Sequence, residues 1–251
     1  MQVDLPACRR PQYSPGGGSA FVYFVVFGVK PPDSPLSGSK YRVAGIPPEL
    51  KISHYQAPKS QELLDGFREG PLWDELRLRE AGLAAAIAEQ NQCVVIHGEF
   101  GDRPDLNYLR DTIGIATWFL DQGGVAVYDP QMFRFWSADD WWRRIFEPVE
   151  PIPRSHAIIL VSAEEGGTEW VHTRGMRKFG RPDISIHGVA PDWKNAAVDV
   201  CNRFIEFQAF GGLVEEGREI RINGFPEGFK CYHRGELEDP DFNNVHLAIE
   251  R

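Results

Sequence analysis

One pattern of residues occurs twice in this chain, and it constrains the fold more than any other feature. Residues 94–98 (Val-Val-Ile-His-Gly) and 184–188 (Ile-Ser-Ile-His-Gly) each have the composition of a short buried strand. Apolar residues then recur at helical spacing, over 106–120 after the first strand and over 193–207 after the second. The sequence therefore predicts two strand–helix units built on the same plan.

Glycine pairs mark the ends of both predicted helices. Gly123-Gly124 and Gly211-Gly212 stand where a left-handed C-cap is expected, and strand-like segments follow at 125–128 and 218–222. We therefore expect an α+β fold of two ferredoxin-like or split β–α–β halves that pack as one compact unit. An internal duplication explains the repeated pattern, and a chance match of a short Ile-His-Gly motif is the alternative.

The proline-rich stretch near residue 150 separates the two halves. We expect the first α+β half to cover 21–150 and the second to cover 151–251, a length sufficient for two such halves. Residues 1–20 are rich in proline and contain three consecutive glycines, a composition that favours a loosely ordered lead-in. Helices are also predicted at 61–69 and 72–90.

Charge and hydropathy exclude two classes of partner. The formal net charge is -9 and the pI is about 5.3, which argues against binding to the nucleic-acid backbone. The longest apolar run, 21–29, is less than half of the roughly 20 residues that a membrane-spanning helix needs. Four scattered cysteines with no metal-binding spacing are typical of a reducing compartment. We therefore expect a cytoplasmic protein that binds neither nucleic acid nor membrane.

The segment 172–183 concentrates positive charge in an acidic protein. Close like charges need a balancing group, and arginine can grip a carboxylate or a phosphate through two hydrogen bonds. The segment is therefore interpreted as a loop that contacts an acidic protein partner or a small anion. The alternative is a solvated hairpin loop whose arginines pair with the chain's own carboxylates. The candidate binding residues in or beside the segment are Trp170, His172, Arg174, Gly175, Arg177, Lys178, Phe179, Gly180 and Arg181, and His97 and His187 complete the set.

A nucleotide-phosphate loop is not predicted here. Gly175 and Gly180 have the glycine spacing that starts a P-loop, but Arg181-Pro182 replaces the required Lys-Ser/Thr. Pro182 also lacks the backbone N–H that a phosphate cradle would use. We expect no cofactor.

The second hypothesis is a hydrolase with a His/Asp cleft. His97 and His187 end the two matching strands, where α/β units often place site residues. A nearby carboxylate, Asp183 or Asp192, completes the minimum for general base catalysis, with Arg174 as an anion clamp. Asp192 and its counterpart Asp102 also stand where helix N-caps belong, so capping is the other interpretation. No nucleophile elbow is present, and the catalytic residues stay unknown.

A metal site is not predicted. The acidic stretch 235–244 offers oxygen ligands of the kind that calcium prefers, but its spacing differs from that of an EF-hand. Pro240 within the stretch fits a simple acidic turn.

The stretch from Thr173 to Asp183 resembles the Thr-x-Gly-Met-x-x-Phe-Gly-x-Pro-Glu/Asp signature of an uncharacterised bacterial domain family. Residues 123–128 resemble the segment after that family's first helix, and the likeness covers roughly 80–215. The resemblance implies no activity, cofactor or catalytic residue. Some members look like accessory or immunity-type proteins near bacterial toxin systems, so an immunity-type role is one form of the binding hypothesis.

Overall fold

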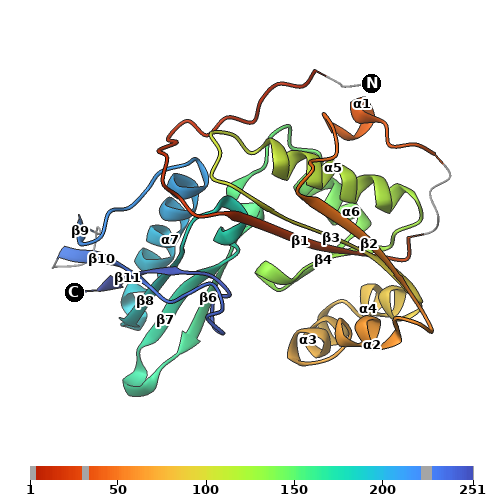
Figure 1. Cartoon of the computed structure of the whole chain (residues 1–251). Coiled ribbons are helices and arrows are strands. Elements are labelled where there is room, and N and C mark those ends of the chain that lie inside the picture. The colour runs from red at the N-terminus through yellow and green to blue at the C-terminus, as the bar shows by residue number, and fades with distance from the viewer. Residues whose placement is uncertain (1–3, 30–33, 222–227, 251) are drawn as a thin grey trace. The chain divides into compact units, whose positions relative to one another are not determined.

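The computed structural model describes residues 4–29, 34–221 and 228–250 (Figure 1). It is 35% helical and 29% strand and contains two sheets, which confirms the α+β class. The chain divides into two compact units. The first consists of Met1–Cys8, Val22–Glu99 and Asn107–Pro151, and the second of Arg9–Phe21, Phe100–Leu106 and Ile152–Arg251.

The first unit is built on a sheet with the strand order β2-β3-β1-β4-β5. The β2/β3, β1/β4 and β4/β5 pairs are antiparallel, and Ile52 lies opposite Ile96 in the β2/β3 register. The strands are β1 (Ala20–Phe27), β2 (Leu50–Gln56), β3 (Gln92–Phe100), β4 (Ala126–Asp129) and β5 (Arg134–Ser137).

Helices cover both faces of this sheet, with α2, α3 and α4 on one side and α5 and α6 on the other (Figure 1). The buried strand β1 serves both faces because its side chains alternate: Val25 and Phe27 join the core that α2–α4 complete, while Phe24 packs against Trp141 of α6. The helices are α1 (Gly38–Tyr41), α2 (Gln61–Gly66), α3 (Pro71–Arg79), α4 (Ala81–Ala88), α5 (Asn107–Asp121) and α6 (Ala138–Trp141), which continues as a π-helical turn, Trp142–Phe146.

The helix predicted over 72–90 is two helices. Glu80 has φ −134 and ψ 57, far from helical values, and it separates α3 from α4. The break lets Trp73 and Leu76 on α3 and Ile87 on α4 enter the same core.

The second unit is built on a sheet with the order β6-β7-β8-β11-β10-β9, in which β8 and β11 are parallel and the other neighbours antiparallel. Its strands are β6 (Ile158–Ala163), β7 (Glu169–Arg174), β8 (Asp183–Val189), β9 (Arg218–Arg221), β10 (Gly228–Arg234) and β11 (His246–Glu250). The long helix α7 (Lys194–Ala209) packs on β7 and β8. Short 3-10 turns occur at Pro153–Ser155, Glu165–Gly167, Met176–Phe179 and Pro191–Trp193.

The predicted strand–helix–strand order occurs in both units, but the ferredoxin-like duplication is not confirmed. In the first sheet only β1 separates β3 from β4, whereas in the second sheet β11 and β10 both separate β8 from β9. The two halves therefore differ in strand order, because segments outside the repeated pattern fill the middle of each sheet. The predicted strand 218–222 ends at Arg221, and its last residue lies outside the described residues.

The predicted lead-in is anchored rather than loose over much of its length. Backbone hydrogen bonds run from Gln12 N to Phe210 O (2.9 Å), from Ser14 N to Gly211 O and from Gly18 N to Gly180 O (both 3.1 Å). These partners all belong to the second unit, which therefore includes Arg9–Phe21. Residues 1–3 of the predicted lead-in lie outside the described residues.

Candidate functional site

The segment expected to be a binding loop is a buried turn centred on the carboxylate of Asp183. Asp183 Oδ1 accepts hydrogen bonds from the hydroxyl of Thr173 (2.9 Å) and the backbone N–H of Met176 (3.2 Å). Its Oδ2 accepts one from the side-chain amide of Asn244 (2.8 Å). Burial raises the pKa of Asp183 to about 6, while these donors act in the opposite direction. The residues that define the family-like signature thus have structural roles.

The two glycines of the turn are required by close backbone packing. Gly175 and Gly180 have φ values of 109 and 62, in the left-handed region. A Cβ on Gly175 would lie 2.5 Å from the carbonyl oxygen of His156, and one on Gly180 would lie 2.3 Å from that of Gly18. Phe179 between them is fully buried. These glycines therefore shape the turn, and no ligand is needed to account for them.

Two of the four cations in the turn lie in the protein interior. Lys178 is fully buried, and its Nζ donates a hydrogen bond to the carbonyl of His156 at 2.8 Å. Arg181 is 2% exposed. Its guanidinium donates to the backbone carbonyls of Gly180 (2.9 Å), Gly211 (3.0 Å) and Gly212 (3.2 Å).

The other two cations are also engaged. Arg174 is buried and donates to the backbone carbonyl of Asp241. Arg177 is half-buried, donates to the carbonyl of Asn243 at 3.0 Å and lies over the ring of Phe21, 4.9 Å from its centroid. The prediction of an accessible basic loop is therefore wrong, because backbone carbonyls and one partly buried carboxylate bind its cations.

That carboxylate is Asp102, which joins two buried arginines. Its Oδ1 lies 2.9 Å from Arg181 Nη1 and 3.4 Å from Arg10 Nη1, and its Oδ2 accepts the N–H of Gly17 at 2.9 Å. The predicted N-cap role does not apply to Asp102, because α5 begins only at Asn107 and both oxygens of the carboxylate are occupied.

Asp192, the counterpart of Asp102, has no equivalent role. It is exposed in the turn Pro191–Trp193, and no side chain caps the start of α7. The predicted capping role of Asp192 is therefore wrong as well.

The ring of Trp170 stacks with those of two histidines. Its ring centroid is 3.8 Å from that of His172 and 5.0 Å from that of His187, and both pairs are nearly parallel. The indole N–H donates to Ser185 Oγ at 2.9 Å. His172 is 4% exposed, and burial followed by the charge of Arg174 lowers its pKa to about 4. His172 is therefore neutral at pH 7.

The structure does not bring the predicted histidine pair together within either unit. His97 is on β3 of the first unit, 5.9 Å from the ring of Tyr23, and burial and Lys51 lower its pKa. His187 is on β8 of the second unit, and its Nδ1 lies 2.7 Å from Glu164 Oε1. The carboxylate that His187 contacts is thus Glu164, and neither Asp183 nor Asp192 takes that place.

The acidic stretch 235–244 contains a turn that Asp239 holds. Its Oδ1 accepts the backbone N–H groups of Asp241 (2.9 Å) and Phe242 (3.2 Å). Across the described ranges, no group of three or more His, Cys, Asp or Glu side chains is placed to hold a metal ion.

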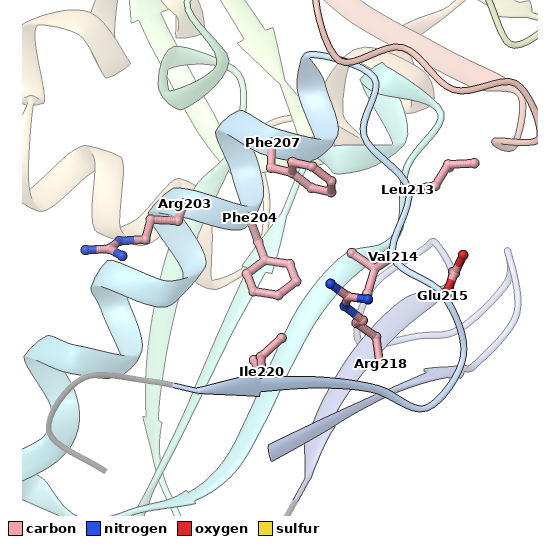
Figure 2. A pocket seen from close by; sticks show the side chains of 8 residues that line it. All are labelled: Arg203, Phe204, Phe207, Leu213, Val214, Glu215, Arg218 and Ile220. Carbon is pink, nitrogen blue, oxygen red and sulfur yellow. The ribbon is translucent and has the colours of Figure 1, made fainter. Parts of the chain in front are cut away.

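A pocket of about 350 Å³ opens between α7 and β9 in the second unit (Figure 2). Its apolar wall is formed by Phe204 and Phe207 from α7, Val214 from the following loop and Ile220 from β9. The remaining lining residues are Arg203, Leu213, Glu215 and Arg218.

Local contacts fix the position of this wall. Phe207 packs over Gly212, where a Cβ would lie 2.4 Å from the ring, so glycine is required for that ring position. The ring nitrogen of His233 on β10 contacts the carbonyl of Val214 at 2.8 Å, and Gly217 N donates to Cys231 O at 2.8 Å. The loop after α7 is therefore tied to β10, and it holds Val214 across from the two phenylalanines.

Arg218 is the charged group at the centre of the pocket. Its side chain extends from β9 so that the guanidinium lies between Val214 and Phe204 (Figure 2). Within residues 4–29, 34–221 and 228–250, no carboxylate forms an ion pair with Arg218, and Glu215 at the rim forms none with it either. An arginine beside an apolar wall can bind the acidic group of a ligand.

The sequence pattern concealed this pocket. Phe204 and Phe207 belong to the apolar stripe of the predicted helix, and residues of such a stripe are expected in the core. The side chain of Phe207 is nevertheless 38% exposed. One sequence signal could have indicated the pocket. Arg218 and Ile220 are two residues apart on a short strand at the sheet edge, so their side chains point to the same face.

No helix in the described part of the chain has the length and apolarity needed to cross a bilayer. Comparison with protein-family models, with curated proteins and with solved structures finds no match for this chain.

Proposed function

We propose that this protein is a non-enzymatic, cytoplasmic binding protein that holds a small anionic ligand with an apolar body in the pocket between α7 and β9. The observation that carries the proposal is the Arg218 guanidinium, which lies beside an apolar wall and forms no ion pair with a carboxylate of the described residues. The site differs from the one predicted, because the cations of the 172–183 turn are already bound by the protein.

The size and lining of the pocket suit such a ligand. Its volume of about 350 Å³ is at the lower end of the range for small-molecule sites. Apolar area that enters the pocket contributes about 25 cal/mol per Å². A carboxylate can then accept two hydrogen bonds from the guanidinium of Arg218, whereas an amide matches that fork less well and an ammonium is repelled.

The lining favours binding over catalysis. Its described residues include no histidine, cysteine or serine, so among them the pocket offers no hydroxyl or thiol nucleophile and no histidine base, and Glu215 at the rim is their single carboxylate. The hydrolase hypothesis would need His187 beside such a pocket, but His187 lies on β8 in contact with Glu164 and Trp170. An immunity-type role, with an acidic protein segment as the ligand, rests on the family resemblance alone.

The cysteines support a reducing compartment. All four are buried and unpaired. Burial raises the pKa of Cys93 and Cys201 to about 12 and that of Cys231 to about 11, so these thiols are poor nucleophiles at neutral pH. This pattern is typical of cytoplasmic proteins.

The test uses three probes that share one apolar body: naphthalene-2-carboxylate, its carboxamide and 2-naphthylmethylammonium. Isothermal titration calorimetry should show the carboxylate binding about tenfold more tightly than the amide, because a hydrogen bond to a charged group contributes about 1.5–3 kcal/mol. Arg218→Gln should reduce carboxylate binding to the amide level. Arg221→Gln is the matched control, since Arg221 is on the same strand but outside the pocket lining.

Equal affinity for all three probes, or unchanged carboxylate binding by the Arg218→Gln protein, would overturn the proposal. Chemical-shift changes that map to the 172–183 turn instead of the pocket would do the same.

A further inference from the structure

The two edges of the second sheet differ sharply in chemistry. The sheet ends at β9 on one side and at β6 on the other. The sequence of β9 is Arg-Glu-Ile-Arg, with three charges in four residues, whereas β6 is Ile-Ile-Leu-Val-Ser-Ala, with no charge and no proline. Charged side chains on an edge strand oppose its pairing with another strand. Strand β9 has this protection and β6 lacks it.

The edge at β6 is also regular. It pairs with β7 along its full length, from Ile158 opposite Arg174 to Ala163 opposite Glu169, and the register is continuous. The one irregularity of β7 lies on its other side, toward β8. In the described residues no strand pairs with the outer edge of β6, and Val161 near its middle is 40% exposed. Regular backbone N–H and C=O groups in this geometry are satisfied best by another strand.

The side chains of β6 determine what that strand must be. Successive residues point to opposite faces, so Ile158 and Leu160 lie on one face and Ile159 and Val161 on the other. A strand added at this edge must therefore carry apolar side chains on both of its faces. Strand β6 of a second copy meets this requirement.

We infer that β6 pairs with β6 of a second copy of this chain in an antiparallel, two-fold symmetric ribbon. A register centred on Val161 places Val161 opposite Val161, Leu160 opposite Ser162 and Ile159 opposite Ala163 of the other copy, so that opposite residues share a face, and each of these pairs is uncharged. An isologous interface of this kind closes as a dimer and leaves no further edge at β6.

The acidic charge of the protein does not oppose this arrangement at the ribbon itself. The nearest carboxylate along the strand is Glu164, directly after β6. In the register given, the two symmetry-related Glu164 residues lie roughly 20 Å apart at 3.3 Å per residue. That separation exceeds the Debye length of about 8 Å at physiological ionic strength. Their mutual repulsion is therefore screened.

The expected dimer is weak and depends on concentration, because one added strand pair buries less area than a standard protein interface. Sedimentation velocity over a wide range of protein concentration should show a monomer–dimer equilibrium. Hydrogen exchange should show that amides within 158–163 gain protection as the dimer fraction rises, while amides of β9 do not.

Val161→Lys should abolish the dimer, because the two-fold axis brings the new charges of both copies close together on the ribbon. Leu78→Lys is the matched control: Leu78 is an 86% exposed apolar residue on α3, and its replacement should leave the dimer unchanged. A monomer at every concentration would overturn the inference. So would a dimer that Val161→Lys leaves intact, or β6 amides that are protected equally at all concentrations, since another segment or protein then covers the edge.

Discussion

The guanidinium of Arg181 lies 2.9 Å from the carboxylate of Asp102, and the two side chains are 0% and 11% exposed. Arg10 shares the same carboxylate oxygen at 3.4 Å. These three residues come from the three segments that compose the second unit. The ion cluster therefore connects segments that are distant in sequence, and it accounts for Arg181, one of the basic residues that were expected to bind a ligand.

Asp102→Asn should strongly destabilise the second unit. The substitution leaves two buried guanidinium groups without a counter-charge, and removal of one partner from a buried ion pair typically costs about 3–5 kcal/mol. Chemical denaturation monitored by circular dichroism measures the loss. The control is Asp74→Asn, which breaks the exposed pair with Arg77 on α3 and should change stability little. Equal effects of the two substitutions would contradict the structural role of the cluster.

Gly180→Ala should cost more stability than Gly188→Ala. Both glycines have positive φ, 62 and 65, so each alanine pays about 1–2 kcal/mol for the left-handed conformation. A Cβ on Gly180 would also meet the carbonyl oxygen of Gly18 at 2.3 Å, whereas nothing lies within 4 Å of one on Gly188. The added strain of overpacking is about 1–3 kcal/mol. Identical unfolding free energies for the two variants would show that the segment around Gly18 does not pack on the turn.

His172 should make the protein less stable in acid. Burial lowers its pKa from 6.5 to about 4, so between these values the unfolded chain binds a proton at His172 that the folded chain does not. Its contribution to stability is therefore lost as the pH falls from about 6.5 to about 4. His172→Phe keeps a ring beside Trp170 and removes the titration, so its unfolding free energy should fall less steeply over this range.

The comparison of the two pH profiles isolates His172. His156, whose pKa burial lowers to about 3, and Asp183, whose pKa burial raises to about 6, are present in both proteins and cancel. His54→Phe, at an exposed position on β2, serves as the control for the exchange of a histidine for phenylalanine. A His172→Phe profile parallel to that of the wild type would refute the prediction.

Phe207→Ala should weaken naphthalene-2-carboxylate binding by roughly fivefold, equivalent to about 1 kcal/mol of lost apolar contact. The preference for carboxylate over carboxamide should persist, because Arg218 is unchanged. Phe133→Ala is the control, since Phe133 has the same 38% exposure but lies in the first unit, outside the pocket. A calorimetric titration in which both variants lose the same affinity would point to a nonspecific effect.

Local patterns predicted most of the secondary structure around the site. The strand that contains His187, the helix after it and the Gly211-Gly212 turn are all present, because hydrophobic period and helix C-capping depend on near neighbours. The break between α3 and α4 was missed, since both helices continue one apolar stripe and the non-helical Glu80 is an ordinary helix former.

The environment of each charge could not be predicted in the same way. The sequence by itself determined the α+β class, the turn between β7 and β8 and the concentration of cations in that turn. Only the tertiary structure decided that Arg181 is buried against Asp102, 79 residues away, and that Arg218 is the cation left beside an apolar wall. The reason is physical: periodicity reports which face of an element is apolar, whereas the solvation of a charge depends on partners brought together from distant segments.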